Sequence, residues 1–331
     1  MISTNFLSGQ GLGNQLWVYA ACRGIAARLK MPFSIGGRDC FKGSGFLNID
    51  WTDKNKKVLP DAASEGKNVI IFRERLYYDP DLDYFASDYD PRVEHLGPDT
   101  HLEGLFQSEE YFYGQDSALG QWLRLSDEML EKANKYRNLC VLNIRGGEYK
   151  RHKNLILPQS YWINGMKNAR KKIGIDQFLI VTDDRAYGKA LFPDIPILEG
   201  GVADCYAALH GARCHVVSNS SFSYFPIKTR ADNPYVIAPY LWSRFANPYE
   251  RWAAPANLYK NWHWQDEEGV IKAYDDCLTI KNKTEEFYFD SYNILTAHSG
   301  LRSTNLMANV PRWVKKPVKA VLSRIFPRVI G

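Results

Sequence analysis

The chain has 331 residues, of which 45% are hydrophobic, 14% aromatic and 24% charged, and this balance excludes a mainly disordered protein. The net charge is +5, but residues 310–331 alone hold six basic side chains and no acidic one, so the rest of the chain is close to neutral. Because nucleic-acid binders usually carry their basic residues over a folded face, we predict no nucleic-acid partner.

The six cysteines are scattered through the chain, with no CxxC pair and no tight Cys/His spacing. Neither a zinc module nor a disulfide framework is therefore expected. No basic and apolar leader precedes the first predicted strand, and no uninterrupted apolar run reaches the roughly 18 residues of a membrane span. These features predict reduced thiols, no bound metal and a cytoplasmic protein.

The amino-terminal half begins with a predicted strand, a glycine loop and a helix. The strand covers residues 2–7, the loop covers 9–15, and apolar residues recur at helical spacing over 16–30. Backbone N–H groups in such a loop can approach a phosphate at the helix start, although a tight turn without a ligand is the alternative. Further apolar runs predict strands at 69–72 and 102–106 and a helix at 126–136.

The carboxyl-terminal half predicts a parallel sheet with crossover helices. Strands are expected at 139–144, 178–181 and 215–217, and helices at 158–173 and 204–213. Ligands collect beyond the carboxyl ends of the strands in a sheet of this kind. The polar residues that follow each strand are therefore the first candidates for a binding site.

Arg145 directly follows the buried strand at 139–144. A guanidinium in that place is costly unless it faces a cleft or an anion, and its fork of donors suits phosphate oxygens. A structural ion pair with Glu148 is the alternative.

Hydroxyl groups and a carboxylate mark two further strand or helix ends. Four serines, at 218, 220, 221 and 223, follow the strand at 215–217 and can donate hydrogen bonds to phosphate oxygens or form a capping turn. Asp204 opens a helix, where it is either a cap or a carboxylate that accepts the paired N–H groups of guanine.

Three motifs occur in a fixed order: GLGNQ at 11–15, GLFQSEEYF at 104–112 and NSSFSYF at 219–225. Together they resemble the α-1,2-fucosyltransferases of glycosyltransferase family 11 over about residues 3–240. The resemblance implies a GT-B-like α/β fold of two Rossmann-like lobes facing a central cleft. It also implies inverting, metal-independent transfer of fucose from GDP-fucose to a glycan hydroxyl, with no cofactor.

The resemblance also implies a division of the chain and a set of roles. Residues 1–137 would form the acceptor-side lobe, 138–300 the donor lobe, and 301–331 a basic amphipathic tail. Arg145 and Glu148 match positions of the family's HxRRxD signature and are the expected catalytic residues, and Asp204 matches the residue that reads guanine. The expected donor-binding residues are Gly11, Gly13, Asn14, Gln15, Arg145, Asp204, Ser220, Ser221, Phe222 and Ser223.

The signature departs from the family pattern. Where the family has His-x-Arg-Arg-x-Asp-Tyr, residues 143–149 read Asn-Ile-Arg-Gly-Gly-Glu-Tyr. A lost guanidinium removes a charge-assisted contact of about 1.5–3 kcal/mol, so either Arg151 or Lys153 replaces it or the donor differs. A transferase using another nucleotide sugar, and a degenerate protein that only binds nucleotide or glycan, are the alternatives.

Two further questions stay open in the sequence. The general base is one of three candidates, Glu148, Asp183 or Glu103. The aromatic-rich stretch 239–264 is either a platform for sugars or the packing between two lobes.

The carboxyl-terminal tail predicts a membrane-surface segment. Apolar residues fall on one side of a helical projection and cations on the other, with Trp313, Lys315, Lys316, Lys319 and Arg324 as the expected membrane-binding residues. Each cation adds about 1 kcal/mol of attraction to an anionic leaflet. The alternative is a terminal helix packed on the protein itself. We therefore predict a peripheral enzyme on the cytoplasmic face of the inner membrane that extends a lipid-linked or cell-surface glycan.

Overall fold

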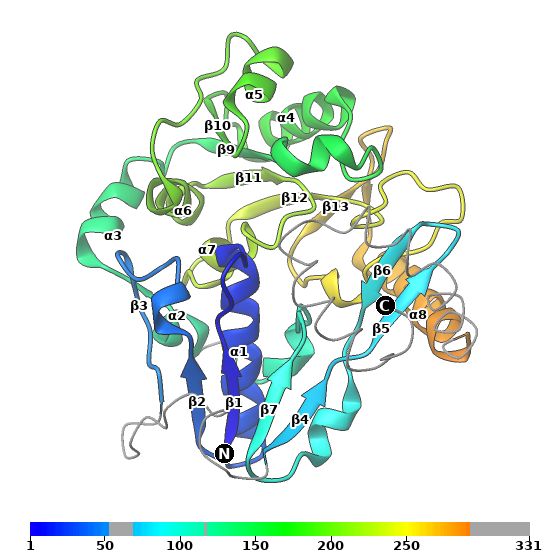
Figure 1. Cartoon of the computed structure of the whole chain (residues 1–331). Helices are drawn as coiled ribbons and strands as arrows, with labels where there is room; N and C mark the ends of the chain where they lie inside the picture. The colour runs from blue at the N-terminus through cyan, green and yellow to red at the C-terminus, as the bar shows by residue number, and fades with distance from the viewer. Residues whose placement is uncertain (53–68, 116–117, 292–331) are drawn as a thin grey trace.

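The computed structural model describes residues 1–52, 69–115 and 118–291, and the predicted tail lies outside them. Two main sheets, each flanked by helices, form the two lobes of an α/β molecule (Figure 1). The predicted fold class, two α/β lobes that face a cleft, is confirmed. Among the described residues, no helix is both long enough and apolar enough to cross a bilayer.

The first sheet is parallel and has four strands in the order β2-β1-β7-β4. These are β1 (Ile2–Asn5), β2 (Phe33–Gly36), β4 (Ile70–Arg73) and β7 (Thr100–Glu103). Helix α1 (Leu12–Arg28) packs against β1 and is buried on nearly all sides, because other elements cover the side that faces away from the sheet. It begins four residues earlier than predicted, since Gly11 is already its N-cap.

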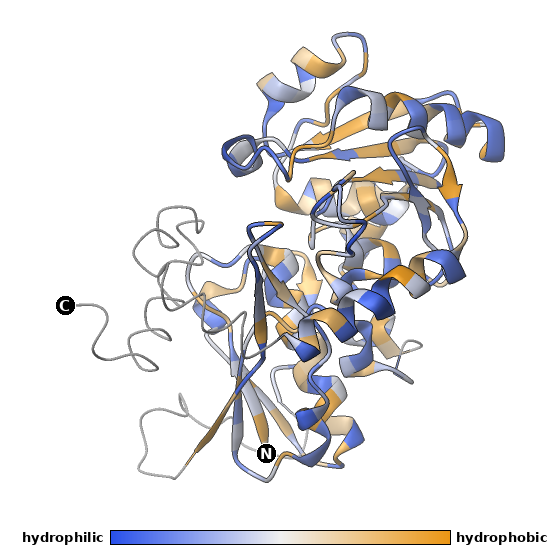
Figure 2. Ribbon diagram, turned by 90° about the vertical axis from the view of Figure 1, so that its right-hand side faces the viewer, coloured by the Kyte–Doolittle hydropathy of each residue, from blue (hydrophilic) through white to orange (hydrophobic). Residues whose placement is uncertain are grey.

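The second sheet has six strands in the order β10-β9-β11-β12-β13-β14 and is parallel except for β14. Its strands are β9 (Cys140–Ile144), β10 (Phe178–Thr182), β11 (Cys214–Val217), β12 (Tyr235–Pro239), β13 (His263–Gln265) and β14 (Ile271–Lys272). Its helices are α4 (Gln159–Ile173), α5 (Arg185–Leu191) and α6 (Val202–Gly211). Figure 2 shows mostly hydrophobic strands between more hydrophilic helices, as expected for strands buried on both faces.

Helix α8 (Tyr274–Asp290), the last element of the described residues, returns to the amino-terminal half (Figure 1). It lies beside the antiparallel hairpin of β5 (Leu76–Asp79) and β6 (Tyr84–Ser87), where the rings of Tyr77 and Tyr288 stack 5.7 Å apart. The remaining elements are β3 (Leu47–Asn48), β8 (Arg124–Leu125), α2 (Leu119–Trp122), α3 (Asp127–Asn134), α7 (Tyr224–Lys228), η1 (Arg38–Cys40), η2 (Pro91–His95), η3 (Glu109–Phe112), η5 (Gly147–Arg151) and η6 (Pro255–Asn257).

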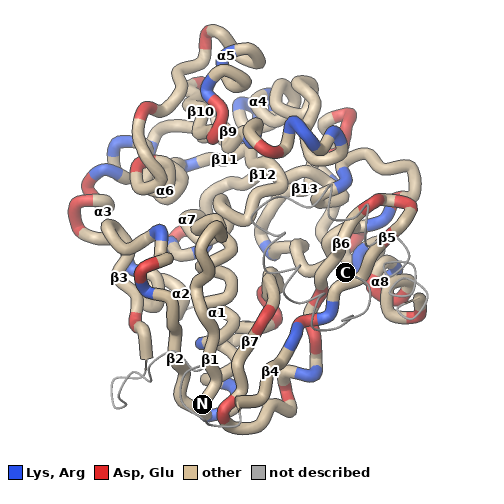
Figure 3. Tube along the Cα trace, viewed as in Figure 1, with Lys and Arg blue, Asp and Glu red and all other residues tan. Residues whose placement is uncertain are grey.

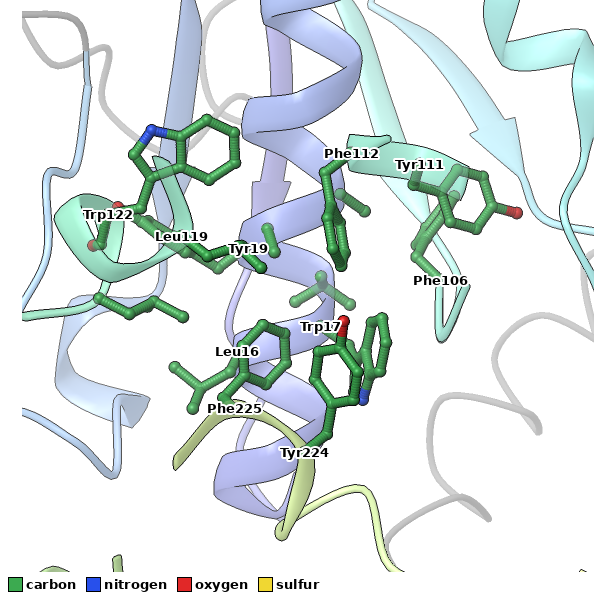
Figure 4. Close-up of a cluster of buried hydrophobic side chains, with 14 of the residues drawn as sticks. Leu16, Trp17, Tyr19, Phe106, Tyr111, Phe112, Leu119, Trp122, Tyr224 and Phe225 are labelled. Carbon is green, nitrogen blue, oxygen red and sulfur yellow. The ribbon is translucent and has the colours of Figure 1, made fainter. Parts of the chain in front are cut away.

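An aromatic cluster joins the two lobes (Figure 4). The Trp17 ring of α1 lies 4.3 Å from the Tyr224 ring and 5.1 Å from the Phe225 ring of α7, measured between centroids. The rings of the aromatic stretch 239–264 are largely buried in the same core, which favours the packing alternative: Trp242, Trp252, Tyr259, Trp262 and Trp264. The second sheet begins with β9 at Cys140, and the division of the chain into lobes at residues 137 and 138 stays a prediction.

Candidate functional site

A cleft of about 1060 Å³ lies where the carboxyl ends of β9, β10 and β11 meet the glycine loop 9–15. The glycine loop belongs to the first sheet's lobe and the strand ends belong to the second. Residues from both lobes line this one cleft, so a ligand held there would contact both.

Arg145 stands at the end of β9 and lines the cleft. Its Nη1 lies 3.1 Å from Oδ2 of Asp183, whose Oδ1 accepts the Gly146 N–H at 2.9 Å. The guanidinium carbon lies 5.1 Å from the centre of the Tyr149 ring. In the described structure the buried Nε has no hydrogen-bond partner. The side chain is 29% exposed, so one carboxylate partly balances a cation that still faces the cleft.

The two glycines that follow Arg145 are required by packing. A Cβ on Gly146 would lie 2.7 Å from Cβ of Asp184 and 2.8 Å from Cδ1 of Tyr187, and one on Gly147 would lie 2.5 Å from Oδ2 of Asp183. The turn that follows β10 therefore occupies the space that a side chain at residue 146 would need. A longer side chain at residue 146 would displace this turn.

Other cations line the same cleft as Arg145. Arg151 and Lys153, the predicted replacements for the second arginine, both reach it and are exposed. Lys42 lines it from the amino-terminal half. Glu148 also lines the cleft.

The serine loop, residues 218–223, crosses from β11 to α7 and contacts the start of α1. Ser220, Ser221 and Phe222 line the cleft. The Ser221 hydroxyl donates to Oδ1 of Asn14 at 2.8 Å, and Nε2 of Gln107 donates to the same oxygen at 2.9 Å. Two donors therefore fix the Asn14 amide at the junction of the lobes.

Gly11 and Gly13 have different reasons to lack a side chain. A Cβ on Gly13 would lie 2.5 Å from the carbonyl carbon of Ser221, so this glycine lets α1 approach the serine loop. A Cβ on Gly11 would meet no atom within 4 Å. Both glycines line the cleft, and the space beside Gly11 is open to a ligand.

Three predicted donor-binding residues do not line the cleft: Gln15, Asp204 and Ser223. Both ends of the Gln15 amide are used by the backbone, since Nε2 donates to the Cys40 carbonyl at 2.7 Å and Oε1 accepts from the Lys42 N–H at 3.0 Å. The Ser223 hydroxyl donates to the Ser220 carbonyl at 2.9 Å and is buried. Both side chains hold loops in place, and their contact with the donor stays a prediction.

Asp204 caps the start of α6, which is the first of its two predicted roles. Its Oδ2 accepts the Gly201 N–H at 3.0 Å, and its Oδ1 accepts from Nζ of Lys132 at 2.9 Å. The hydrogen bond from Lys132 lowers the pKa of this carboxyl. A carboxylate at the start of α6 satisfies a free backbone N–H, which explains its place without a nucleotide.

The three candidates for the general base differ in whether they line the cleft. Glu103 pairs with Arg73, at 3.0 Å between Nε and Oε2, and does not line the cleft, whereas Glu148 and Asp183 do. Sequence reasoning missed the residues that the β5–β6 hairpin and the residues after β12 add to the cleft wall: Tyr78, Asp83, Tyr84, Phe85 and Arg244. Two short runs around the turn at 80–83 could have indicated the hairpin, but not that it reaches the cleft.

The described residues contain no group of three or more His, Cys, Asp or Glu side chains placed to hold a metal ion. All six cysteines are free thiols.

No protein-family model matches the sequence, and no curated protein matches it. Solved structures similar to this chain include POFUT1 in complex with GDP-fucose, with 13% identity, a TM-score of 0.42 and coverage of 72% of this chain and 97% of that chain. NodZ α-1,6-fucosyltransferase soaked with GDP-fucose has 11% identity, a TM-score of 0.41 and coverage of 71% and 93%. Fucosyltransferase NodZ from Bradyrhizobium has 13% identity, a TM-score of 0.42 and coverage of 68% and 92%. These similarities assign no role to any residue of this chain.

Proposed function

We propose that the protein is an inverting, metal-independent glycosyltransferase that transfers fucose from GDP-fucose to a hydroxyl of a glycan. One observation carries the proposal: Arg145 and the serine loop, which lie more than 70 residues apart in the sequence, line the same cleft as the glycine loop. A guanidinium, hydroxyl groups and a helix start are the groups that bind a diphosphate.

These groups would also stabilise the transition state. Negative charge grows on the diphosphate as the bond to the sugar breaks, while the sugar becomes oxocarbenium-like. Donors that are already fixed around the diphosphate stabilise this charge more than they stabilise the ground state. Asn14 and Ser221 are held by their mutual hydrogen bond, so they are in place before the donor binds.

The nucleotide, the linkage and the acceptor extend this proposal. GDP-fucose and an α-1,2 linkage are what the resemblance of the sequence motifs to glycosyltransferase family 11 implies, and the acceptor would be a glycan of a cell-surface polysaccharide. Because Asp204 is a capping residue, this proposal assigns no guanine-reading role to it.

The test of the nucleotide is a thermal-shift panel of GDP, UDP, ADP and their sugars. A nucleotide that binds only the folded state stabilises it by about 2.7 kcal/mol at a hundred times its Kd. We expect GDP and GDP-fucose to raise the Tm of the wild type, and Arg145→Ala to abolish the rise. The exposed Arg185, which pairs with Glu199 outside the cleft, supplies the control variant Arg185→Ala. An unchanged Tm with every nucleotide would overturn the proposal.

A second function is a protein that binds a nucleotide or a glycan without turnover. It is favoured by the pairing of Arg145 with Asp183 and by the glycines that replace the second arginine. Release of GDP from GDP-fucose, with or without an added glycan, separates the two functions. If the protein binds GDP-fucose and never releases GDP, its function is binding without turnover.

We also propose that residues 301–331 hold the enzyme on the anionic cytoplasmic face of the inner membrane, where the acceptor glycan is lipid-linked. The proposal rests on the six cations of residues 310–331 and on the apolar residues of this segment. Flotation with vesicles that contain anionic lipid should recover the full chain and leave residues 1–309 behind. Equal recovery of the full chain and of residues 1–309 would favour the alternative, in which this segment packs on the protein.

A further inference from the structure

The β5–β6 hairpin forms a wall of the cleft that the donor-binding residues leave unused. Four of its residues line the cleft, namely Tyr78, Asp83, Tyr84 and Phe85. Asp83 is exposed, and the rings of Tyr84 and Phe85 are partly exposed. A carboxylate beside accessible rings thus lines the amino-terminal side of the cleft.

A buried arginine from the other half of the chain holds the tip of this hairpin. Arg244 is 8% exposed, and its Nε and Nη2 donate to the carbonyls of Leu82 and Asp83 at 2.8 and 2.7 Å. Its guanidinium carbon lies 4.4 Å from the centre of the Tyr84 ring. Asp83 has a φ of +45°, a conformation that aspartate and asparagine adopt more readily than most residues. The tip is therefore fixed by the fold.

The carboxylate is oriented as well. The Tyr78 hydroxyl donates to Oδ1 of Asp83 at 2.7 Å. A carboxylate has about four acceptor positions, so one hydrogen bond leaves it able to accept from a ligand. A sugar offers hydroxyl donors at its edge and C–H groups on its face, which suit a carboxylate and an aromatic ring respectively.

The hairpin wall is close to Arg145. The Tyr84 hydroxyl donates to the Ser243 hydroxyl at 3.1 Å, and the Ser243 N–H donates to Oδ1 of Asn219 at 3.0 Å. The Tyr149 hydroxyl donates to the carbonyl of the same Asn219 at 2.7 Å, so the two tyrosines contact one shared residue pair. The Tyr149 ring in turn lies under the Arg145 guanidinium. A sugar on the hairpin would therefore lie beside the group proposed to hold the diphosphate.

We propose that Asp83, with the rings of Tyr84 and Phe85, forms the subsite for the pyranose ring of the acceptor glycan. This inference rests on the proposed transferase function. Asp83 accepts hydrogen bonds from hydroxyl groups of the sugar, the rings contact its face, and Arg244 acts as a positioning residue through the hairpin tip.

The test uses saturation-transfer NMR with the methyl glycosides of glucose, galactose, mannose, N-acetylglucosamine and N-acetylgalactosamine, each with and without GDP. Asp83→Asn is the variant, since asparagine tolerates the positive φ and keeps an acceptor for Tyr78. Asp81→Asn is the matched control, because Asp81 lies on the same turn, pairs with Arg251 and does not line the cleft.

We expect at least one glycoside to bind the wild type and Asp81→Asn equally, and Asp83→Asn about tenfold more weakly, the factor that corresponds to about 1.4 kcal/mol. GDP affinity, measured by calorimetry on the same samples, should be equal in all three proteins. If no glycoside binds, or if Asp83→Asn binds as the wild type does, the subsite is refuted while GDP uptake upholds the donor site. If GDP does not bind, the proposed function is refuted. The subsite is then judged only by whether Asp83→Asn binds the glycoside more weakly than the wild type does.

Discussion

Arg145 shares its guanidinium with Asp183, and a bound diphosphate would be a second anion beside the same group. The ion pair joins side chains that are 29% and 27% exposed, so water screens it considerably. Such a pair contributes only about 0.2–1 kcal/mol. Asp183 also holds the Gly146 N–H, so it positions the turn while it competes for the cation.

Replacing Asp183 by asparagine should therefore strengthen the binding of GDP. The amide oxygen of asparagine can still accept the Gly146 N–H, while the repulsion between carboxylate and diphosphate is lost. We expect the Kd for GDP to fall by a factor of about 1.4 to 5, the equivalent of the roughly 0.2–1 kcal/mol of such a solvent-screened pair, and guanosine binding to stay unchanged.

Calorimetry at low and high salt checks this, since screening should reduce the gain. Asp184→Asn is the control: it pairs with Lys150, caps α5 and does not line the cleft. Weaker binding of GDP by Asp183→Asn would mean that the carboxylate is needed to position Arg145.

At the scale of the element, a buried carboxyl holds the turn that brings residue 105 to the cleft. Oε2 of Glu74 accepts the N–H groups of Leu105 and Phe106 at 2.7 and 2.9 Å, and its Oε1 accepts from the Tyr111 hydroxyl at 3.0 Å. Burial raises the pKa of Glu74 to about 7. The end of β4, the turn after β7 and η3 are thus joined by one titratable group.

Glu74 should make the stability of this region depend on pH. Its pKa in the folded protein exceeds the ordinary value of 4.5, so the folded state binds more protons than the unfolded state between these two values. The contribution to stability is full below about pH 4.5 and is lost as the pH rises through about 7.

The variant Glu74→Gln measures this contribution to stability, because glutamine does not titrate. The unfolding free energy of the wild type, relative to the variant, should fall by roughly 3 kcal/mol from pH 4.5 to pH 8, at about 1.4 kcal/mol per unit of pKa shift. Denaturant unfolding across this range measures it. The exposed Glu131→Gln on α3 is the control and should show no such trend. A constant difference for Glu74→Gln would contradict the prediction.

At the scale of the whole molecule, the two lobes are joined by packing and by charge. The cluster around Trp17 is continuous with the core of the first lobe, and Arg251 pairs with Asp79 of the hairpin. Figure 3 shows basic and acidic positions close together where the hairpin meets α8. Because residues of both sheets pack in this one core, we expect the two sheets to unfold together.

Calorimetry should therefore show one unfolding transition for the wild type. Trp17→Ala, which removes the ring at the junction of the lobes, should lower the unfolding free energy by about 3–5 kcal/mol. We also expect it to weaken GDP binding, because α1 and the serine loop would lose a shared support. Two separate transitions in the wild type would show that the lobes fold independently.

The sequence predicted the parts of the site that depend on local order. Apolar runs identified β9 and β11, and the residues that follow a strand in a parallel sheet lie at the same edge. Arg145, Ser220 and Ser221 therefore reach one cleft, as predicted. The sequence predicted donor contacts for Asp204 and Gln15 from the motifs around them. In the structure their side chains bind backbone N–H and carbonyl groups instead, and these partners are brought into reach only by folding.

The α/β class, the main strands and helices and the cation at the end of β9 could be derived from the sequence, since periodicity and turn residues act over short distances along the chain. The lack of room for a second arginine beside the turn after β10, and the place of the hairpin tip in the cleft wall, became evident only in the folded protein. Both depend on contacts between segments far apart in the sequence, and no local pattern encodes the space that such segments leave for each other.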